Sequence, residues 1–181
     1  MFKKIAIGLG LVIVIVLGLA TTKPDSFEIE RVATIKAPPE KIMPLLSDFH
    51  NWTIWSPWEH LDPNMQRTFS GAVSGKGAVY AWKGNSDVGE GRMEIVEMVS
   101  PTRLVIKLDF LTPVESNNMT EFALVPQGEQ TTVTWKMKGP MPFVSKIMTV
   151  FVSMETLIGP DLDRGIAKLK VSAEAPAVPA T

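Results

Sequence analysis

Hydrophobic and polar residues follow three successive patterns along the chain. From Ile5 to Ala20 no charged residue and no proline interrupts an apolar run. From Phe27 onward apolar and polar residues alternate, which is typical of β-strands with one buried face. After Pro142 the apolar positions recur about every 3.6 residues, the period of an amphipathic helix. We therefore expect an apolar N-terminal helix, a β-rich middle and a long C-terminal helix.

The alternating region predicts seven strands and two short helices. The first strand is Phe27 to Ile35, and Pro38 and Pro39 then open a short helix that a second short helix or turn, Phe49 to Trp55, follows. Because turn-forming residues separate the remaining strands at short intervals, we expect an antiparallel meander. These six strands are expected at Asn64–Ser70, Ala78–Lys83, Gly91–Val99, Arg103–Leu111, Asn118–Pro126 and Thr131–Lys138.

One apolar stripe predicts the long C-terminal helix, and Gly159 with Pro160 predicts a kink or a break within it. The tail from Ser172 to Thr181 is rich in Ala and Pro and has little to bury, so we expect it to be flexible. The stripe consists of Phe143, Ile147, Val150, Phe151, Met154, Leu157, Ile158, Leu162, Ile166 and Leu169.

The apolar N-terminal run is either a transmembrane anchor or a signal peptide. Lys3 and Lys4 precede it, and its length is close to the roughly 20 residues that cross a bilayer. If it is retained, the protein is a single-pass protein of the cell membrane, and if it is cleaved, the protein is secreted or periplasmic. In both cases the domain lies on the extracytoplasmic side. We thus divide the chain into a leader (1–22), a spacer (23–26), one domain (27–171) and the tail (172–181).

Composition excludes several classes of site. Without Lys3 and Lys4, 16 of the 18 basic residues remain against 19 acidic ones, so a nucleic-acid partner is not expected. The absence of cysteine excludes thiol catalysis and cysteine-ligated metals. No repeated ligand spacing indicates a metal site, no catalytic residues are assigned, and no cofactor is implied.

Six short motifs are spread along the domain. They are RVATIKAP (Arg31 to Pro38), FHNWTIWSP (Phe49 to Pro57), GAVYAW (Gly77 to Trp82), GEGRMEI (Gly89 to Ile95), VTWKM (Val133 to Met137) and IGPD (Ile158 to Asp161). With the order of the predicted elements, these motifs resemble the helix-grip fold of the START-like, or SRPBCC, superfamily, in particular its polyketide cyclase/dehydrase group and a membrane-anchored bacterial branch. The resemblance covers roughly residues 27–170. It implies an α+β fold in which a seven-stranded curved antiparallel sheet wraps around the long C-terminal helix.

The resemblance also implies a cavity between sheet and helix for an apolar molecule. Strand alternation and the helical stripe supply candidate walls, although apolar burial alone does not separate a solid core from a pocket. The candidate ligand-binding residues are Trp55, Trp82, Met93, Leu108, Phe110, Phe122, Trp135, Met137, Phe151, Met154 and Ile158.

Three functions remain open at this point. The first is a membrane-tethered extracytoplasmic binding or carrier protein for a hydrophobic small molecule or lipid. The second is a cyclase/dehydrase-type enzyme acting on an apolar ligand in the same cavity, for which His50, Glu59 and Asp161 are the available acid/base groups. The third is a partner-interaction domain whose interior is filled by its own side chains.

Overall fold

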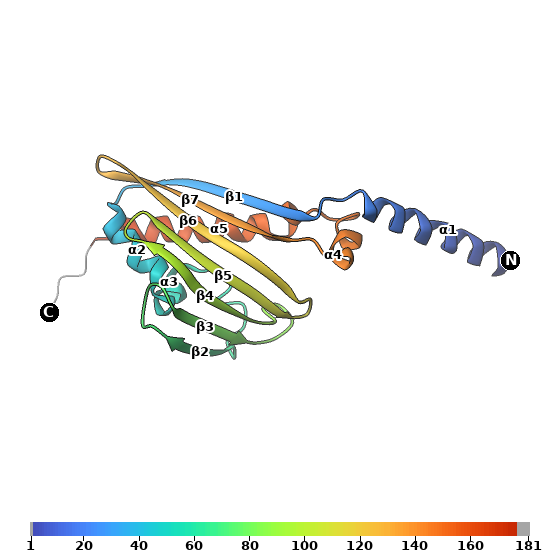
Figure 1. Cartoon of the computed structure of the whole chain (residues 1–181), viewed down its shortest axis with the longest axis horizontal. Coiled ribbons are helices and arrows are strands. Elements are labelled where there is room, and N and C mark those ends of the chain that lie inside the picture. The colour runs from blue at the N-terminus through green and yellow to red at the C-terminus, as the bar shows by residue number, and fades with distance from the viewer. Residues whose placement is uncertain (1, 177–181) are drawn as a thin grey trace.

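A single curved antiparallel sheet forms the body of the domain in a computed structural model, which describes residues 2–176 (Figure 1). Its strand order is β1-β7-β6-β5-β4-β3-β2, so β1 returns to pair with the last strand. Every paired strand is antiparallel, and register shifts at Glu90/Gly91 and Ile95/Glu97 help to bend the sheet. The strands are β1 (Ser26–Ile35), β2 (Gln66–Gly71), β3 (Ala78–Lys83), β4 (Glu90–Val99), β5 (Arg103–Thr112), β6 (Ser116–Gln127) and β7 (Gln130–Pro140).

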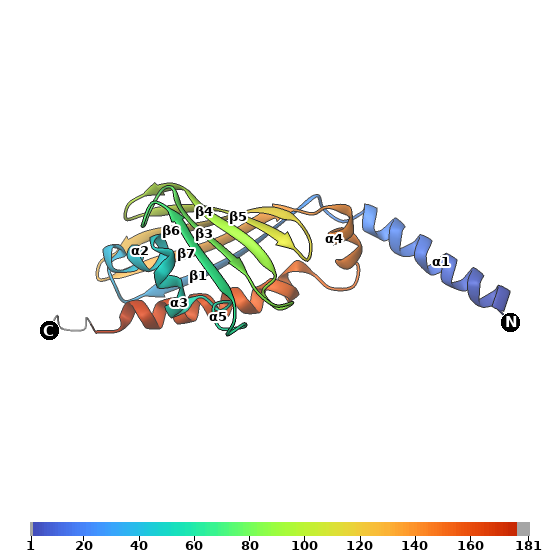
Figure 2. The same ribbon diagram turned by 90° about the horizontal axis from the view of Figure 1, so that it is seen from below.

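One long helix, α5 (Met154–Glu174), lies against the concave side of this sheet, as Figure 2 shows from below. The short helices α2 (Pro39–Ser47), η1 (Phe49–Asn51) and α3 (Trp52–Trp55) follow β1, and α2 and α3 contact α5. The predicted helix-grip architecture is therefore confirmed.

The break in the C-terminal helical region lies earlier than predicted. A short helix, α4 (Phe143–Met148), is separated from α5 by residues 149–153, whereas α5 runs without interruption through Gly159 and Pro160. Ser153 starts the new helix, because its hydroxyl accepts a hydrogen bond from the Thr156 N–H at 3.1 Å. The alternative of a break at Gly159 and Pro160 was thus wrong, since packing of α5 on the sheet outweighs the one hydrogen bond that Pro160 removes, whereas the alternative of a kink there stays a prediction.

The C-terminal end of α5 is held by hydrogen bonds to other elements. The Lys36 N–H donates to a Glu174 carboxylate oxygen at 2.7 Å, and the Lys170 ammonium donates to the Thr34 carbonyl at 2.6 Å. Helix α5 therefore extends three residues beyond the predicted domain end at residue 171. Of the predicted flexible tail, residues 177–181 lie outside the described part of the chain.

The solid core occupies the half of the domain beside the second half of α5. There Leu162, Ile166 and Leu169 of α5 are buried against the sheet and α2. Gly165 permits the close approach, because a Cβ at this position would lie 2.7 Å from the Trp135 ring. The first half of α5 does not pack directly on the sheet in this way, because its inward side chains Met154 and Ile158 line a cavity between helix and sheet.

An ion-pair network ties that first half of α5 to the sheet. The guanidinium of Arg31 on β1 donates at 2.5 Å to Asp163 and at 2.5 Å to Glu155. These hydrogen bonds raise the pKa of Arg31 above its ordinary value. The network fixes the distance between helix and sheet beside the open space.

The N-terminal helix α1 (Phe2–Thr21) projects from one end of the domain (Figures 1 and 2). It is long and apolar enough to cross a membrane. Among the described residues of this helix, Ala20 alone is buried. At the end that joins the domain, the helix contacts α4 (Figure 1). At about 1.5 Å per residue its 20 residues measure roughly 30 Å, the thickness of a hydrocarbon core.

Candidate ligand-binding cavity

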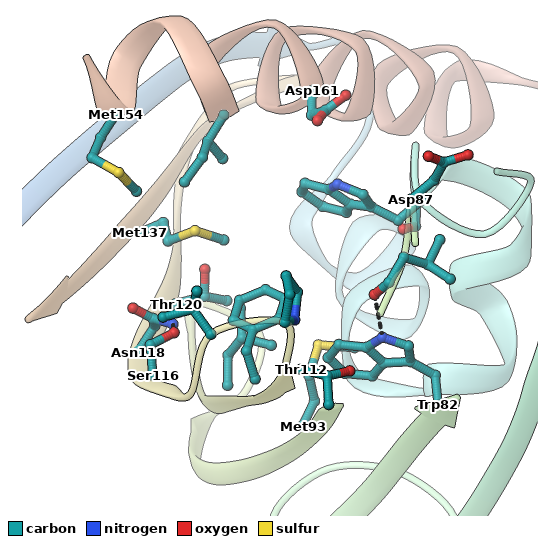
Figure 3. A pocket seen from close by; sticks show the side chains of 18 of the residues that line it. Trp82, Asp87, Met93, Thr112, Ser116, Asn118, Thr120, Met137, Met154 and Asp161 are labelled. Carbon is teal, nitrogen blue, oxygen red and sulfur yellow. Dashed lines mark hydrogen bonds between the residues drawn. The ribbon is translucent and has the colours of Figure 1, made fainter. Parts of the chain in front are cut away.

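A cavity of about 410 Å³ lies between the concave face of the sheet and the first half of α5 (Figure 3). Strands β3 to β7 supply one wall, and α4, α5 and the segment after α3 supply the others. Most of the lining side chains are apolar. They are Phe27, Trp52, Ser56, Trp58, Glu59, Met65, Tyr80, Trp82, Asp87, Val88, Met93, Leu108, Phe110, Thr112, Pro113, Val114, Ser116, Asn118, Thr120, Trp135, Met137, Pro140, Met141, Ser145, Met148, Met154, Ile158 and Asp161.

Eight of the eleven candidate ligand-binding residues line this cavity. Six come from inward-facing strand positions and two from the first half of α5, in agreement with the alternation and the helical stripe. Their role in ligand binding stays a proposal. They are Trp82, Met93, Leu108, Phe110, Trp135, Met137, Met154 and Ile158.

The other three candidates do not reach the cavity. Trp55 and Phe122 have no exposed surface and pack with Trp135, their ring centroids lying 5.5 Å and 5.1 Å from its own. Phe151 lies in the turn between α4 and α5, and 71% of it is exposed. The structure therefore assigns Trp55 and Phe122 to the core and Phe151 to the surface.

The boundary between cavity and core runs across the sheet at Trp135. On β6, Asn118 and Thr120 face the cavity, while Phe122, two residues further along, faces the core. On β7, Met137 faces the cavity and Val133 the core, with Trp135 between them. Which inward residue contacts a ligand thus depends on its position along the strand, which the alternating pattern does not encode.

Sequence reasoning missed several walls that lie outside the strands. Trp52 and Trp58 line the cavity, so four of the five tryptophans of the chain do so together with Trp82 and Trp135. Met141 and Met148 approach from the region of α4. The density of aromatic residues between Phe49 and Trp58 was the available signal for the first two, whereas no pattern marks the methionines.

A row of polar side chains on β6 interrupts the apolar lining. Figure 3 shows Ser116, Asn118 and Thr120 together on one side of the cavity. The Asn118 amide N–H donates to the Ser116 hydroxyl at 3.1 Å, and the Trp135 indole N–H donates to the Thr120 hydroxyl at 3.2 Å. The Asn118 carboxamide oxygen accepts no hydrogen bond from residues 2–176, so it is available to a ligand donor.

A second polar group, Glu59, has both carboxylate oxygens hydrogen-bonded to neighbouring side chains. The Tyr80 hydroxyl donates to one carboxylate oxygen at 2.7 Å, and the Arg67 guanidinium donates to the other at 2.8 Å. Burial, and then the hydrogen bond to Glu59, raises the pKa of Tyr80, while the hydrogen bond to Glu59 raises the pKa of Arg67. Tyr80 therefore remains a hydrogen-bond donor at every physiological pH.

The other acid/base candidates differ in position. His50 lies outside the cavity, where its ring stacks on Phe69 with centroids 4.0 Å apart and contacts Asp48 at 2.8 Å. Asp161 projects from α5 toward the cavity and is paired with Arg164 (Figure 3). Within residues 2–176, no three His, Asp or Glu side chains cluster closely enough to hold a metal ion.

The match to a family model covers the whole domain. Residues 26–174 match the family described as polyketide cyclase / dehydrase and lipid transport. The chain belongs to this family. No curated protein matches the chain significantly.

Solved structures share the fold at low sequence identity. A protein from Chromobacterium violaceum is 14% identical with a TM-score of 0.58, covering 84% of this chain and 100% of its own. Norcoclaurine synthase from Thalictrum flavum, in complex with dopamine and hydroxybenzaldehyde, is 12% identical with a TM-score of 0.62, covering 84% of this chain and 90% of its own. The di-domain ARO/CYC BexL of the BE-7585A biosynthetic pathway is 15% identical with a TM-score of 0.62, covering 88% of this chain and 54% of its own. At these identities the likeness concerns the fold alone.

Proposed function

We propose that the protein is a membrane-tethered, extracytoplasmic binding or carrier protein for a hydrophobic small molecule or lipid. The observation that carries this proposal is the cavity of about 410 Å³, which falls within the roughly 300–1,000 Å³ of small-molecule sites. Its walls are tryptophans, methionines and aliphatic side chains, and apolar contact with a ligand would stabilise the complex. The family description, which includes lipid transport, agrees with such a role.

The polar row on β6 indicates what the ligand carries besides its apolar body. Asn118 is 4% exposed and lines the cavity, and its carboxamide oxygen accepts no hydrogen bond within residues 2–176. A ligand that displaces water from this oxygen has to replace the lost hydrogen bond, so a ligand hydroxyl or amide N–H at this place would be favoured. We therefore propose an amphipathic ligand with at least one hydrogen-bond donor.

A binding role is favoured over the cyclase/dehydrase alternative by the state of the polar groups. Both carboxylate oxygens of Glu59 are occupied by Tyr80 and Arg67, and His50 is not in the cavity. Asp161 is the remaining carboxylate from that set, and it is paired with Arg164. The partner-interaction alternative required a filled interior, which the cavity volume disfavours.

The membrane tether of the proposal is α1. Its length and composition suit a span, and Lys3 and Lys4 at its start favour the cytoplasm. This orientation leaves the domain on the extracytoplasmic side, whether α1 is retained or acts as a cleaved signal.

Tryptophan fluorescence of the full-length chain in detergent tests the binding proposal. A fatty acid with a nitroxide on its acyl chain should quench most of the emission, because four of the five tryptophans line the cavity. Leu108→Phe, which adds a ring inside the cavity, should weaken binding of this probe by about tenfold. The control is Leu61→Phe at an exposed position, which should bind normally. Quenching that is weak, or equal in both variants, would reject a cavity site.

A further inference from the structure

Apolar side chains are exposed at the end of the domain from which α1 leaves. Val144 on α4 is 64% exposed, and Phe151 in the turn after α4 is 71% exposed. Phe143 and Val152 beside them are also exposed. Water-soluble domains leave single apolar residues at the surface, whereas several exposed apolar residues within one short segment are typical of an interaction site.

The turn between β5 and β6 adds to this exposed group. Leu111 near the end of β5 and Val114 in the turn are exposed, and Figure 1 shows that the β5–β6 turn and α4 lie at the same end of the domain. We call Leu111, Val114, Phe143, Val144, Phe151 and Val152 the docking surface.

The same two elements border the cavity. Ser145 and Met148 of α4 line the cavity from one side, and Pro113 and Val114 of the β5–β6 turn line it from another. Helix α4 and the β5–β6 turn thus carry exposed apolar side chains on the surface of the domain and also line the cavity. A ligand that passed between them would move from the docking surface directly into the cavity.

Polar contacts fix the docking surface next to α1. The Met141 N–H donates to the Asp25 carbonyl at 2.7 Å, and the Lys146 ammonium on α4 pairs with the Asp25 carboxylate. Ala20, in the last turn of α1, is fully buried, and α1 contacts α4. The docking surface therefore starts where a membrane-spanning α1 would end.

The charge of this region suits contact with lipid. From Pro140 to Ser153 the chain has one charged residue, Lys146, which Asp25 neutralises. Between Leu111 and Val114 there is none, and the exposed Glu115 follows at the end of the β5–β6 turn. Burial of an uncharged apolar surface in lipid is favourable, whereas burial of an unpaired charge would cost several kcal/mol, so Glu115 has to stay in water or among the lipid headgroups.

We propose that the docking surface rests in the face of the bilayer that α1 crosses, so that the cavity exchanges its ligand directly with the lipid phase. This proposal rests on the tether and the apolar cavity of the proposed function and adds the route by which the ligand enters. The occupant of the docking surface is lipid rather than a protein, because α1 holds this end of the domain at the bilayer.

Lipid contact can be measured with a single label, because the chain has no cysteine of its own. Val144→Cys and Val73→Cys would carry a polarity-sensitive fluorophore in the full-length chain, reconstituted into phosphatidylcholine vesicles that contain nitroxide-labelled lipid. Val73 is a matched control, since it is 80% exposed and lies in the β2–β3 turn, where Gly75 contacts Ser47 of α2. We expect quenching at position 144 and none at position 73.

Other results in this assay overturn the proposal. In one such result, alkaline washing leaves the protein in the vesicles but lipid does not quench the label at position 144. The membrane tether would then be right, and contact of the docking surface with lipid would be wrong. A label at position 144 shielded from aqueous iodide but unquenched by lipid would indicate a second copy or another protein on this surface. If alkaline washing released the protein from the vesicles, both the membrane tether and the lipid contact of the docking surface would be refuted.

Ligand entry is tested separately. Val144→Glu should slow transfer of a nitroxide-labelled fatty acid from vesicles to the cavity by about tenfold, because a charge replaces an apolar contact with lipid. Binding of the same probe in detergent should be unchanged, since Val144 does not line the cavity. Val73→Glu is the control and should change neither rate nor affinity. Equal transfer by both variants would refute direct entry, whereas failure of the unmodified protein to bind the probe in detergent would refute the proposed function instead.

Discussion

Removing the hydroxyl of Tyr80 should destabilise the domain by about 2 kcal/mol. Tyr80 and Glu59 are 2% and 5% exposed, and the hydroxyl donates to the carboxylate at 2.7 Å. Hydrogen bonds to charged groups contribute about 1.5–3 kcal/mol, and Tyr80→Phe would leave a Glu59 oxygen without its partner in a site that water barely reaches. The ring itself is retained, so its packing on Phe49 and Phe69 should persist.

Thermal unfolding of the full-length chain in detergent measures this loss. For a domain of about 150 residues, 1 kcal/mol lowers the melting temperature by about 2–4 °C, so Tyr80→Phe should lower it by about 4–8 °C. In a double-mutant cycle with Glu59→Gln, the two substitutions should be clearly non-additive, because each removes part of the same hydrogen bond. A change below about 0.5 kcal/mol, or simple additivity, would refute the view that Glu59 is held by Tyr80.

Three further predictions follow from single side chains. Burial and the Glu59 hydrogen bond raise the pKa of Tyr80 above 10.0, so protonated Tyr80 contributes stability that is complete below pH 10.0 and declines as the pH rises beyond it. Since Tyr80 is the only tyrosine of the chain, tyrosinate absorbance should appear only with unfolding, and titration of the folded protein near pH 10.0 would contradict this prediction. Gly139→Ala would place a Cβ 1.8 Å from the Asn118 carboxamide oxygen and should displace this hydrogen-bond acceptor, so binding of an alcohol-headed amphiphile should weaken by up to about tenfold. The methyl-capped analogue, which has no hydroxyl to donate, is the control and should bind as before. In equilibrium unfolding, Trp135→Ala should lower the free energy of unfolding by about 3–5 kcal/mol and Phe151→Ala by less than about 0.5 kcal/mol, because Trp135 is buried and Phe151 is exposed. Similar losses in the two variants would contradict these positions.

The strands were predictable because their signal is local. Each alternating segment between turn residues became a strand, and Ala78–Lys83 was predicted to the residue. The other strand boundaries moved by at most two residues. Antiparallel order then follows from short connections, so little of the sheet depends on information outside the pattern.

The turn after α4 was not predictable in this way. Val150 and Phe151 continue the helical stripe, and a pattern of apolar residues does not distinguish side chains that face a core from side chains that face outward. The helix ends there because Ser153 caps a new one and Arg31 holds the first turns of α5 against β1. Both causes depend on tertiary contacts.

The sequence predicted which faces of the strands point inward, but not which part of each face lines the cavity and which part lies in the core. Alternation identified the inward faces of β5, β6 and β7, yet it treated Phe122 like Leu108, although one lies in the core and the other in the cavity. The pairing of Glu59 with Tyr80, 21 residues apart, has no sequence signature at all. Only the curvature of the sheet and the path of α5 decide these questions.

Lipid extraction followed by mass spectrometry tests the central claim most directly, on the full-length chain purified from its native membrane in mild detergent. The account predicts that an amphipathic molecule with a hydrogen-bond donor co-purifies in a near one-to-one ratio with the protein and is reduced in Leu108→Phe but not in Leu61→Phe. Protein that carries nothing, and that takes up no apolar probe when exposed to one, would contradict a cavity built to hold a hydrophobic ligand.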